Sequence, residues 1–219
     1  MSNSIIFIYD IICIFPNIVI SLQYQENQEV MTTSIYKTSD YLTTDEIHRL
    51  IRYFKKLGNL RMCLLIEFGV KTLLRYSDLS RIQWVEIVGK DTLILNEKKT
   101  NKRREITIGK SLRESIETTY NELKQPHNEE FVFQYTLQHT NLLLKEGGRD
   151  VKIRNKNISS HSFRKSGSRF IWENNGHSDE YLIKLSSILN HSSSSMTRKY
   201  LGISRDEIKD IYQSFDELM

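Results

Sequence analysis

The chain has 219 residues, of which 39% are hydrophobic and 26% are charged, and its formal net charge is +4. This composition is typical of an ordinary soluble globular protein, and the length allows one or two domains with a sizeable core. The two cysteines, Cys13 and Cys63, form neither a disulfide framework nor a CxxC metal pattern, which fits a reducing cytoplasm.

Charge is distributed unevenly along the chain. The first thirty residues contain Asp10, Glu26 and Glu29 but neither lysine nor arginine, so they carry −3 and the remaining residues carry +7. A basic body favours an anionic partner such as DNA, although basic charge alone does not identify one.

An apolar run over residues 5–22 precedes the basic body. It lacks the basic start of a signal peptide and the positive flanks of a transmembrane helix, and Asp10, Pro16 and Asn17 interrupt it. We interpret residues 1–30 as the result of a translation start assigned too far upstream. A packed extension of the domain is the second interpretation, and a membrane anchor is the third. Residues 1–41 are therefore treated as an N-terminal extension, and no stable membrane association is expected.

The folded body is predicted to begin near residue 42 with two helices. Thr43 and Glu46 form a capping-box pattern, in which each side chain can satisfy the other residue's backbone N–H. Apolar residues at helical spacing predict a helix over 45–56 and, after a Gly-Asn break, a second helix over 60–72. Both apolar faces are interpreted as core.

Arg75 comes just before a short predicted helix that runs to Trp84. The backbone N–H groups and the positive dipole at a helix start favour an anion, and an arginine at that place would strengthen a phosphate site. The alternative is a surface arginine without a ligand.

Three β-rich runs follow, over 84–88, 92–95 and 104–108, and they predict a small antiparallel sheet of three strands. The turn over 98–102 is rich in lysine, so a lysine at its tip can reach into a groove or an active site. A solubilising hairpin turn is the plainer interpretation.

Helical patterns dominate the rest of the chain. One helix is predicted over 111–123, and another runs from Thr136 to Lys145 and ends at Gly147-Gly148, because glycine commonly terminates a helix. A basic linker over 149–156 then leads to four further predicted helices, over 160–172, 179–189, 196–200 and 205–218.

Four side chains in the last third of the chain have the chemistry to act on one phosphate. His161 and Arg164 are three residues apart and share a helix face, and His191 and Tyr200 follow on separate segments. Arginine offers a planar fork to a phosphate, histidine can move a proton near neutral pH, and tyrosine can be a covalent nucleophile. Any one of them alone is more commonly structural, so the order and spacing of the set carry the argument.

The order and sequence context of these residues resemble the catalytic domain of the tyrosine recombinases, the phage integrase family. The matching segments are Leu74-Arg75-Tyr76-Ser77-Asp78-Leu79 with Trp84, Lys99-Thr100-Asn101-Lys102 with Arg104, His161-Ser162-Phe163-Arg164, Leu189-Asn190-His191-Ser192-Ser193 and Met196-Thr197-Arg198-Lys199-Tyr200. The resemblance extends over about residues 42–211. Leu73 and Asn190 depart from the family's glycines, and Asp78 departs from its glutamate.

The resemblance implies a fold and a site. The fold would be α+β and mainly α-helical, similar to a tyrosine recombinase catalytic domain over residues 42–219, with the three-stranded antiparallel sheet packed on a helical bundle. Neither a metal nor another cofactor is implied. The implied catalytic residues are Arg75, Lys99, His161, Arg164, His191 and Tyr200.

The family's chemistry implies a role for each of these groups. Tyr200 would attack a DNA phosphate and form a 3′-phosphotyrosyl link, while Arg75 and Arg164 stabilise the charge on the phosphate oxygens. Lys99 would be the general acid for the leaving 5′ oxygen, with Lys102 as the fallback. His161 would help to move the proton of Tyr200, and His191 would donate a hydrogen bond to the phosphate.

Double-stranded DNA is the implied partner, and the implied activity is site-specific recombination of the integrase or invertase type, which moves or inverts a phage or mobile segment. A homo-oligomer on DNA, from dimer to tetramer, would form through the C-terminal helix. The location would be cytoplasmic, in a bacterial host or its nucleoid. Further basic residues are expected to contact DNA: Lys102, Arg103, Arg104, Arg149, Lys152, Arg154, Lys165 and Arg198.

Two alternatives remain open at this point. A type IB topoisomerase uses similar residues, although the small size argues against it, and a DNA-binding regulator that has lost catalysis is the other. Family members usually carry a separate helical core-binding domain, and none is expected here because too few residues precede Thr43. Its absence would leave the source of sequence specificity in doubt.

Overall fold

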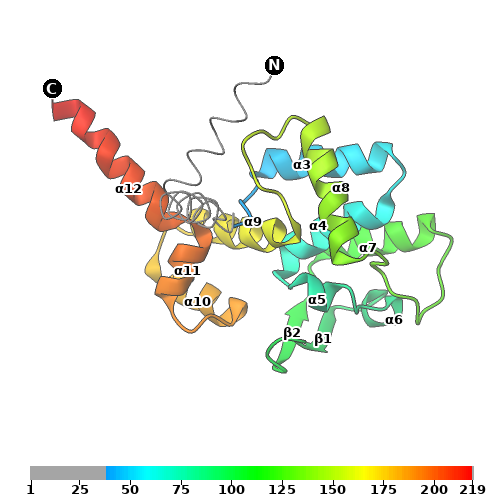
Figure 1. Cartoon of the computed structure of the whole chain (residues 1–219). Helices are drawn as coiled ribbons and strands as arrows, with labels where there is room; N and C mark the ends of the chain where they lie inside the picture. The colour runs from blue at the N-terminus through cyan, green and yellow to red at the C-terminus, as the bar shows by residue number, and fades with distance from the viewer. Residues whose placement is uncertain (1–37, 219) are drawn as a thin grey trace, which may run out of the picture. The chain divides into compact units, whose positions relative to one another are not determined.

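Helices make up most of the described chain (Figure 1). The structure is a computed structural model that describes residues 38–218, and the residues from Ser39 onward belong to one unit. The start predicted to be assigned too far upstream lies outside the described residues. The helices are α3 (Thr44–Lys56), α4 (Leu60–Thr72), α5 (Tyr76–Leu79), α6 (Trp84–Ile87), α7 (Lys110–Glu122), α8 (Leu137–Asp150), α9 (Ser160–Glu173), α10 (Asp179–Leu189), α11 (Ser194–Leu201) and α12 (Ile203–Ser214), followed by the 3-10 helix η1 (Phe215–Leu218).

The start of α3 confirms the predicted capping box. Thr43 N donates to Glu46 Oε2 at 2.8 Å, and Glu46 N donates to Thr43 Oγ1 at 3.3 Å. These bonds satisfy two of the backbone donors that a helix start leaves free. Leu50 and Phe54 on α3 are buried in the same core cluster as most apolar residues of α4, so the core interpretation of both helices is also confirmed.

The sheet is smaller than predicted. Strands β1 (Thr92–Asn96) and β2 (Arg103–Thr107) pair in antiparallel fashion, with Asn96 opposite Arg103, and no third strand joins them in the part of the chain that the structure describes. The hairpin therefore presents its lysine-rich turn, residues 98–102, as predicted, but from two strands rather than three.

The strand predicted over 84–88 is wrong, because Trp84–Ile87 is a single helical turn, α6. Gln83 N donates to Glu86 Oε2 at 2.7 Å, which fixes the start of a helix. Trp84 and Ile87, three residues apart, are both fully buried. Local capping and helical spacing of the buried residues outweigh the β propensity of tryptophan, valine and isoleucine here.

Two adjacent glycines lie inside α8, so the prediction that the helix ends at Gly147-Gly148 is wrong. A Cβ on Gly147 would lie 3.2 Å from Phe54 Cζ on α3, and one on Gly148 would lie 2.4 Å from Ile158 Cδ1. The glycines therefore allow neighbouring segments to approach α8 closely.

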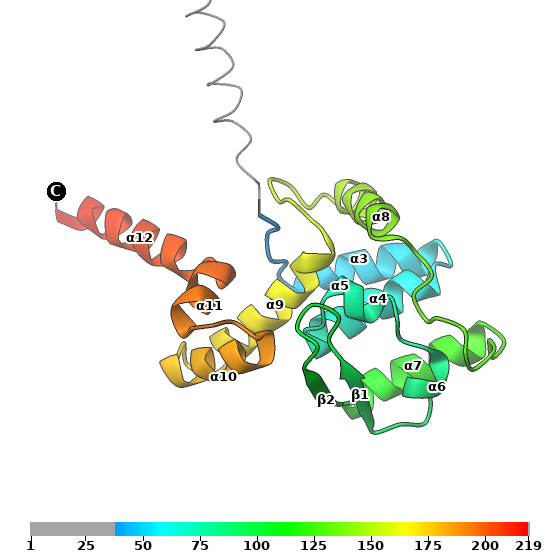
Figure 2. The same cartoon turned by 60° about the horizontal axis from the view of Figure 1, so that its bottom comes forward.

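Helix α9 lies between two groups of helices, with α3, α4 and α8 on one side and α10 and α11 on the other (Figures 1 and 2). Ser159 Oγ caps its start by accepting from His161 N at 3.2 Å. A Cβ on Gly167 would lie 2.1 Å from Val70 O, so α9 crosses α4 at close range. This contact brings the predicted H-x-x-R segment to the centre of the unit.

The lead-in segment Ser39–Leu42 packs along α9. Leu42 N donates to Ser166 Oγ at 2.8 Å, and the side chain of Leu42 is buried in the main core cluster. The guanidinium carbon of Arg169 lies 4.1 Å from the centre of the Tyr41 ring, a cation–π contact. Residues just before α3 are thus fixed to the helix that carries two of the predicted catalytic residues.

Candidate active site

Two largely buried arginines, Arg75 and Arg164, meet at one backbone carbonyl. Arg75 immediately precedes α5, and Arg164 lies in the second turn of α9. Arg75 Nη2 donates to Leu189 O at 3.3 Å, and Arg164 Nη2 donates to the same oxygen at 2.6 Å. Arg164 Nη1 also donates to Leu73 O. The shared carbonyl holds the two guanidinium groups side by side, where one phosphate can receive N–H groups from both.

Helix α9 places Arg164 in a strongly positive environment. Burial lowers the pKa of its guanidinium to about 10, with Tyr200 opposing that change and Arg75 and Arg104 adding to it. The group therefore remains charged at neutral pH, and a dianionic or monoanionic phosphate would relieve the repulsion between the neighbouring arginines.

A fully buried carboxylate, that of Glu97, lies beside these arginines at the end of β1. Burial alone would raise the pKa of Glu97, but hydrogen bonds and the charge of Arg75 outweigh burial and lower it, so the group is ionised. Its Oε2 accepts from three side chains and its Oε1 from one: Arg75 Nη1 at 2.9 Å, Thr100 Oγ1 at 2.9 Å, Asn190 Nδ2 at 2.7 Å and Arg104 Nη1 at 3.1 Å.

Lys99 lies in the turn between β1 and β2, and its side chain is exposed. The turn is held on both sides of it, because Lys98 N donates to Asp78 Oδ1 at 2.7 Å and Thr100 bonds to the buried carboxylate. The charge of Lys99 contributes to lowering the pKa of His161, which places its ammonium group near that ring.

Both predicted histidines have pKa values below the ordinary value of 6.5. Desolvation by the surrounding protein is the main cause for each ring, and the charges of Arg164 and Arg75 add to it. Part of the surface of residue His161 is open to solvent, although its ring is desolvated enough to lower the pKa. His191 is half-buried, with Nδ1 3.0 Å from Thr197 Oγ1. Both imidazoles are therefore mainly neutral at pH 7, where each can accept a proton or donate one N–H.

Tyr200 projects from α11 next to His191, with the ring centres 5.1 Å apart in an edge-on arrangement. Its hydroxyl is buried and has no hydrogen bond of normal geometry to any residue that the structure describes. Burial raises the pKa of Tyr200, although Arg164 and Arg75 are near enough for their charges to oppose that effect. The phenol hydroxyl therefore lies inside the site, next to the guanidinium groups of both arginines.

The six predicted catalytic residues thus come from five segments and lie in one cluster. The carbonyl of Leu189 joins the two arginines, and a ring contact joins His191 to Tyr200. The charges of Arg164 and Arg75 act on Tyr200 and His161, and the charge of Lys99 acts on His161. Their chemical roles stay predictions.

The residues predicted to contact DNA fall into two groups. Three are engaged within the chain, since Arg104 Nη2 donates to Thr72 O at 2.6 Å, Lys165 Nζ to Ser39 O at 3.1 Å, and Arg198 pairs with Asp179 and Glu207. The others have exposed side chains: Lys102, Arg103, Arg149, Lys152 and Arg154.

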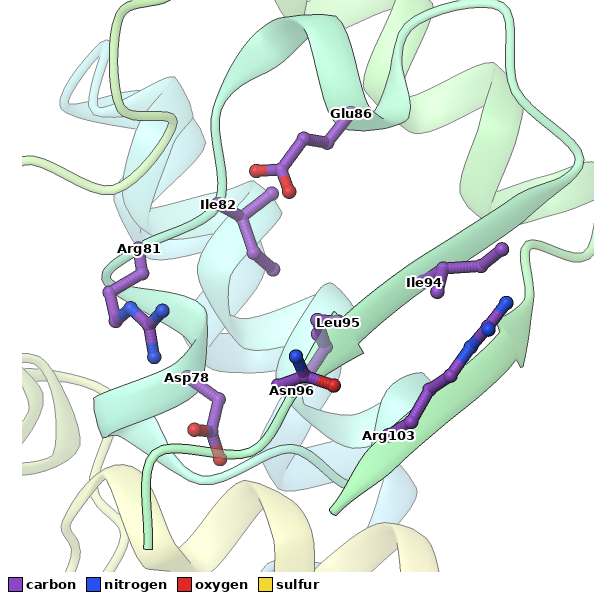
Figure 3. A pocket seen from close by; sticks show the side chains of 8 residues that line it. All are labelled: Asp78, Arg81, Ile82, Glu86, Ile94, Leu95, Asn96 and Arg103. Carbon is purple, nitrogen blue, oxygen red and sulfur yellow. The ribbon is translucent and has the colours of Figure 1, made fainter. Parts of the chain in front are cut away.

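A hollow of about 430 Å³ lies between α5, α6 and the two strands (Figure 3). Its charged lining residues are of both signs, Asp78 and Glu86 against Arg81 and Arg103, and Ile94 adds an apolar wall. None of the predicted catalytic residues lines it. The hollow borders the lysine-rich turn instead, because Asp78 in its lining accepts from Lys98 N.

Residues 38–218 contain no group of three or more His, Cys, Asp or Glu side chains that could hold a metal ion. No helix in the same range is long and apolar enough to cross a membrane.

The roles of two residues at the site were not predicted from the sequence. Glu97 was not singled out, although a carboxylate at the head of the basic run 97–104 was a usable signal. Asn190 was noted for departing from the family's glycine, but its hydrogen bond to Glu97 could not be foreseen without the fold.

Known proteins similar to this chain are recombinases. The "Probable integrase/recombinase YoeC" of Bacillus subtilis (strain 168) is 29% identical over 167 residues, which are 73% of this chain and 87% of that protein. The XerH site-specific recombinase bound to difH substrate has a similar fold, with a TM-score of 0.58, 20% identity, and coverage of 75% of this chain and 51% of that one. The chain thus spans about half the length of that solved recombinase.

Two further solved structures share the fold. XerA recombinase has a TM-score of 0.60 and 17% identity, covering 80% of this chain and 64% of that one. The catalytic domain of bacteriophage HP1 integrase has a TM-score of 0.54 and 19% identity, covering 74% of this chain and 87% of that one. The mainly helical recombinase catalytic fold is thereby confirmed, with a sheet of two strands in place of three. The phage integrase family model matches residues 40–207, well over half of the chain, and the chain therefore belongs to the phage integrase family.

Proposed function

We propose that this chain is a site-specific DNA recombinase that cuts and rejoins DNA through a 3′-phosphotyrosyl intermediate, with residues 42–219 as its catalytic domain. The observation that carries the proposal is the buried hydroxyl of Tyr200 beside two arginines that share one carbonyl. Tyr200 Oη attacks the scissile phosphorus, the bond from phosphorus to the 5′ oxygen breaks, and that oxygen takes a proton.

The arginines supply electrostatic stabilisation in this scheme. Arg75 and Arg164 donate N–H groups to the non-bridging oxygens, whose charge grows in the transition state. Both are already oriented by Leu189 O, so little reorganisation is needed when the phosphate arrives. His191 donates a further hydrogen bond to the phosphate.

Proton transfer is assigned to His161 and Lys99. The pKa of Tyr200 is raised by burial, so the phenol needs a base, and the pKa of His161 is lowered, so its ring is free to assist. Lys99 protonates the departing 5′ oxygen. Because the phosphotyrosyl bond conserves the energy of the broken bond, a second 5′ hydroxyl can reverse the reaction without a nucleotide or a metal.

The surface of the unit supports a proposal for DNA binding and for assembly. We assign backbone contacts first to the exposed basic residues Lys102, Arg103, Arg149, Lys152 and Arg154. Helix α12 projects away from α9 (Figure 1). Exposed apolar side chains lie on α12 at Ile208, Ile211 and Tyr212 and on η1 at Phe215. We propose that this face docks on a second copy bound to the same DNA, giving a dimer to tetramer.

The test is covalent capture of DNA. Wild type and Tyr200→Phe are incubated with nicked duplexes tiled across the DNA that flanks the gene, and the mixtures are extracted with phenol after denaturation. Wild type should give protein–DNA linkage that resists extraction, and Tyr200→Phe should give none while still retarding DNA in a gel. A wild-type protein that binds these duplexes without linkage would instead identify a DNA-binding regulator, and relaxation of supercoils by the monomer would identify a topoisomerase.

A further inference from the structure

The side chains bound to Glu97 connect segments that are far apart in the sequence. Its carboxylate joins Arg75, next to α5, to Thr100 in the hairpin turn and to Asn190 at the end of α10. The backbone of Glu97 also closes the turn, since Glu97 N donates to Lys102 O at 3.0 Å and Asn101 N donates to Glu97 O at 2.8 Å. A displacement of this one side chain would therefore disturb the positions of Arg75, the hairpin turn and the end of α10 together.

We propose that Glu97 and Asn190 are positioning residues for the general acid, which together hold the Lys99 turn against the end of α10. This inference rests on the recombinase function proposed above. It adds a structural cause for the placement of Lys99, whose own side chain is exposed.

The conformation of Asn190 supports a specific role for its side chain. Asn190 ends α10 with φ 52° and ψ 47°, a left-handed conformation that glycine adopts more readily. Backbone conformation alone would therefore favour glycine at this position. The asparagine side chain instead adds a hydrogen bond of 2.7 Å to Glu97, which links α10 to the hairpin.

The end of α10 is the part of the site that the arginines already fix. Leu189 O, one residue earlier, accepts from both Arg75 and Arg164, and His191 follows one residue later. A hairpin tied to Asn190 is thus tied to the phosphate-binding groups. Thr100, bonded to the same Glu97 oxygen, is the residue after Lys99.

The chemistry of the leaving group gives a selective test of this role. An alkoxide leaves poorly unless it is protonated as the bond from phosphorus to oxygen breaks. A thiolate needs no such proton, because a thiol has a pKa of about 8.5, far below that of an alcohol. Replacing the bridging 5′ oxygen by sulfur therefore rescues any defect in the general acid, but no defect in the arginines or the nucleophile.

The experiment measures single-turnover cleavage of one nicked duplex with either oxygen or sulfur at the bridging position. The duplex is the one that yields most covalent product with wild type. Asn190→Gly keeps the backbone conformation and removes the side-chain bond, and Thr100→Val removes the neighbouring bond with little change in shape. Asn155→Gly, also a left-handed asparagine, and Glu105→Gln, on exposed β2, are the matched controls.

We expect Asn190→Gly and Thr100→Val to slow cleavage of the oxygen substrate by roughly tenfold, a fraction of what a placed general acid contributes. On the sulfur substrate both should cleave within about twofold of wild type, because the acid is then dispensable. Glu97→Gln should be rescued only in part, since it also weakens the contact to Arg75. The controls should match wild type on both substrates.

Equal losses on the two substrates, or no loss on the oxygen substrate, would overturn the positioning role while leaving the recombinase function standing. A wild-type protein that forms no covalent product with either substrate would overturn both. Thermal unfolding of each variant is measured in parallel, and Thr100→Val decides the matter if Asn190→Gly does not fold.

Discussion

Some side chains of the site can be predicted from the sequence, whereas the contacts that orient them depend on the fold. The H-x-x-R spacing, the lysine-rich turn and the order of Arg75, His191 and Tyr200 carry the family resemblance that implies the six catalytic residues. What the sequence could not supply is which groups neutralise the arginines. Glu97 lies two residues before Lys99 but 22 residues after Arg75, and only the fold brings the end of β1 to the start of α5.

The first residue-scale prediction concerns the shape of Arg164. Arg164→Lys keeps a positive charge but cannot donate to Leu73 O and Leu189 O together, as the guanidinium does. Cleavage should fall by roughly a hundredfold, the scale for losing one oxyanion donor. Linkage to Tyr200 should remain detectable in overnight reactions. The exposed Arg52→Lys is the matched control, and wild-type rates in Arg164→Lys would contradict the role.

The second residue-scale prediction concerns pH. Since His161 and His191 have pKa values lowered from 6.5, both stay neutral until the pH falls below that value. The acid limb of the cleavage rate should therefore lie below pH 6.5, with a flat rate from there to pH 8. Single-turnover cleavage across pH 5–8 measures it. An acid limb centred above pH 6.5 would contradict neutral histidines in the reactive state.

Glu97 gives a third residue-scale prediction, on stability. Its pKa in the folded state is lowered from 4.5, so its ionised form stabilises the fold above that pH and the contribution is lost as the pH falls through the lowered value. Glu97→Gln should unfold with a weaker pH dependence than wild type below pH 4.5. Chemical denaturation at several pH values tests this, and parallel curves for the two proteins would contradict it.

At the scale of elements, the sequence predicted helices best where capping and periodicity agreed. Thr43 with Glu46 marked the start of α3 correctly, whereas Trp84–Ile87 combined β-prone residues with a helical cap and was misjudged. Gly147 and Gly148 were misjudged for another reason. Their lack of side chains serves contacts with Phe54 and Ile158, which are invisible until the helices are packed.

The lead-in segment provides the element-scale prediction. A chain that begins at Met31 keeps Tyr41 against Arg169 and Leu42 against Ser166, so it should fold and cleave DNA like the full chain. A chain that begins at Thr43 loses both contacts and the burial of Leu42, which is worth about 1.5–3 kcal/mol. Thermal unfolding and covalent capture of the two chains test the difference. Equal behaviour of both would show that the segment contributes nothing.

At the scale of the whole unit, the site lies where two hydrophobic clusters meet. One cluster contains α3, α4 and the hairpin, and the other contains Leu73, Trp172, Leu185, Leu189 and Leu201. Arg75 and Arg164 bond to carbonyls of the second cluster, Leu73 O and Leu189 O, while the first cluster includes Phe163 on α9. The geometry of the site therefore depends on how the two clusters pack, and so on the fold as a whole.

The measurement that tests the central claim most directly is the location of the covalent DNA adduct. Wild-type protein trapped on a nicked duplex is digested with protease and nuclease, and the peptides are mapped by mass spectrometry. The account predicts a phosphodiester remnant on Tyr200. An adduct on Tyr181, Tyr212 or any other residue would contradict the assignment of the nucleophile and of the segment from His191 to Tyr200 as part of the active site.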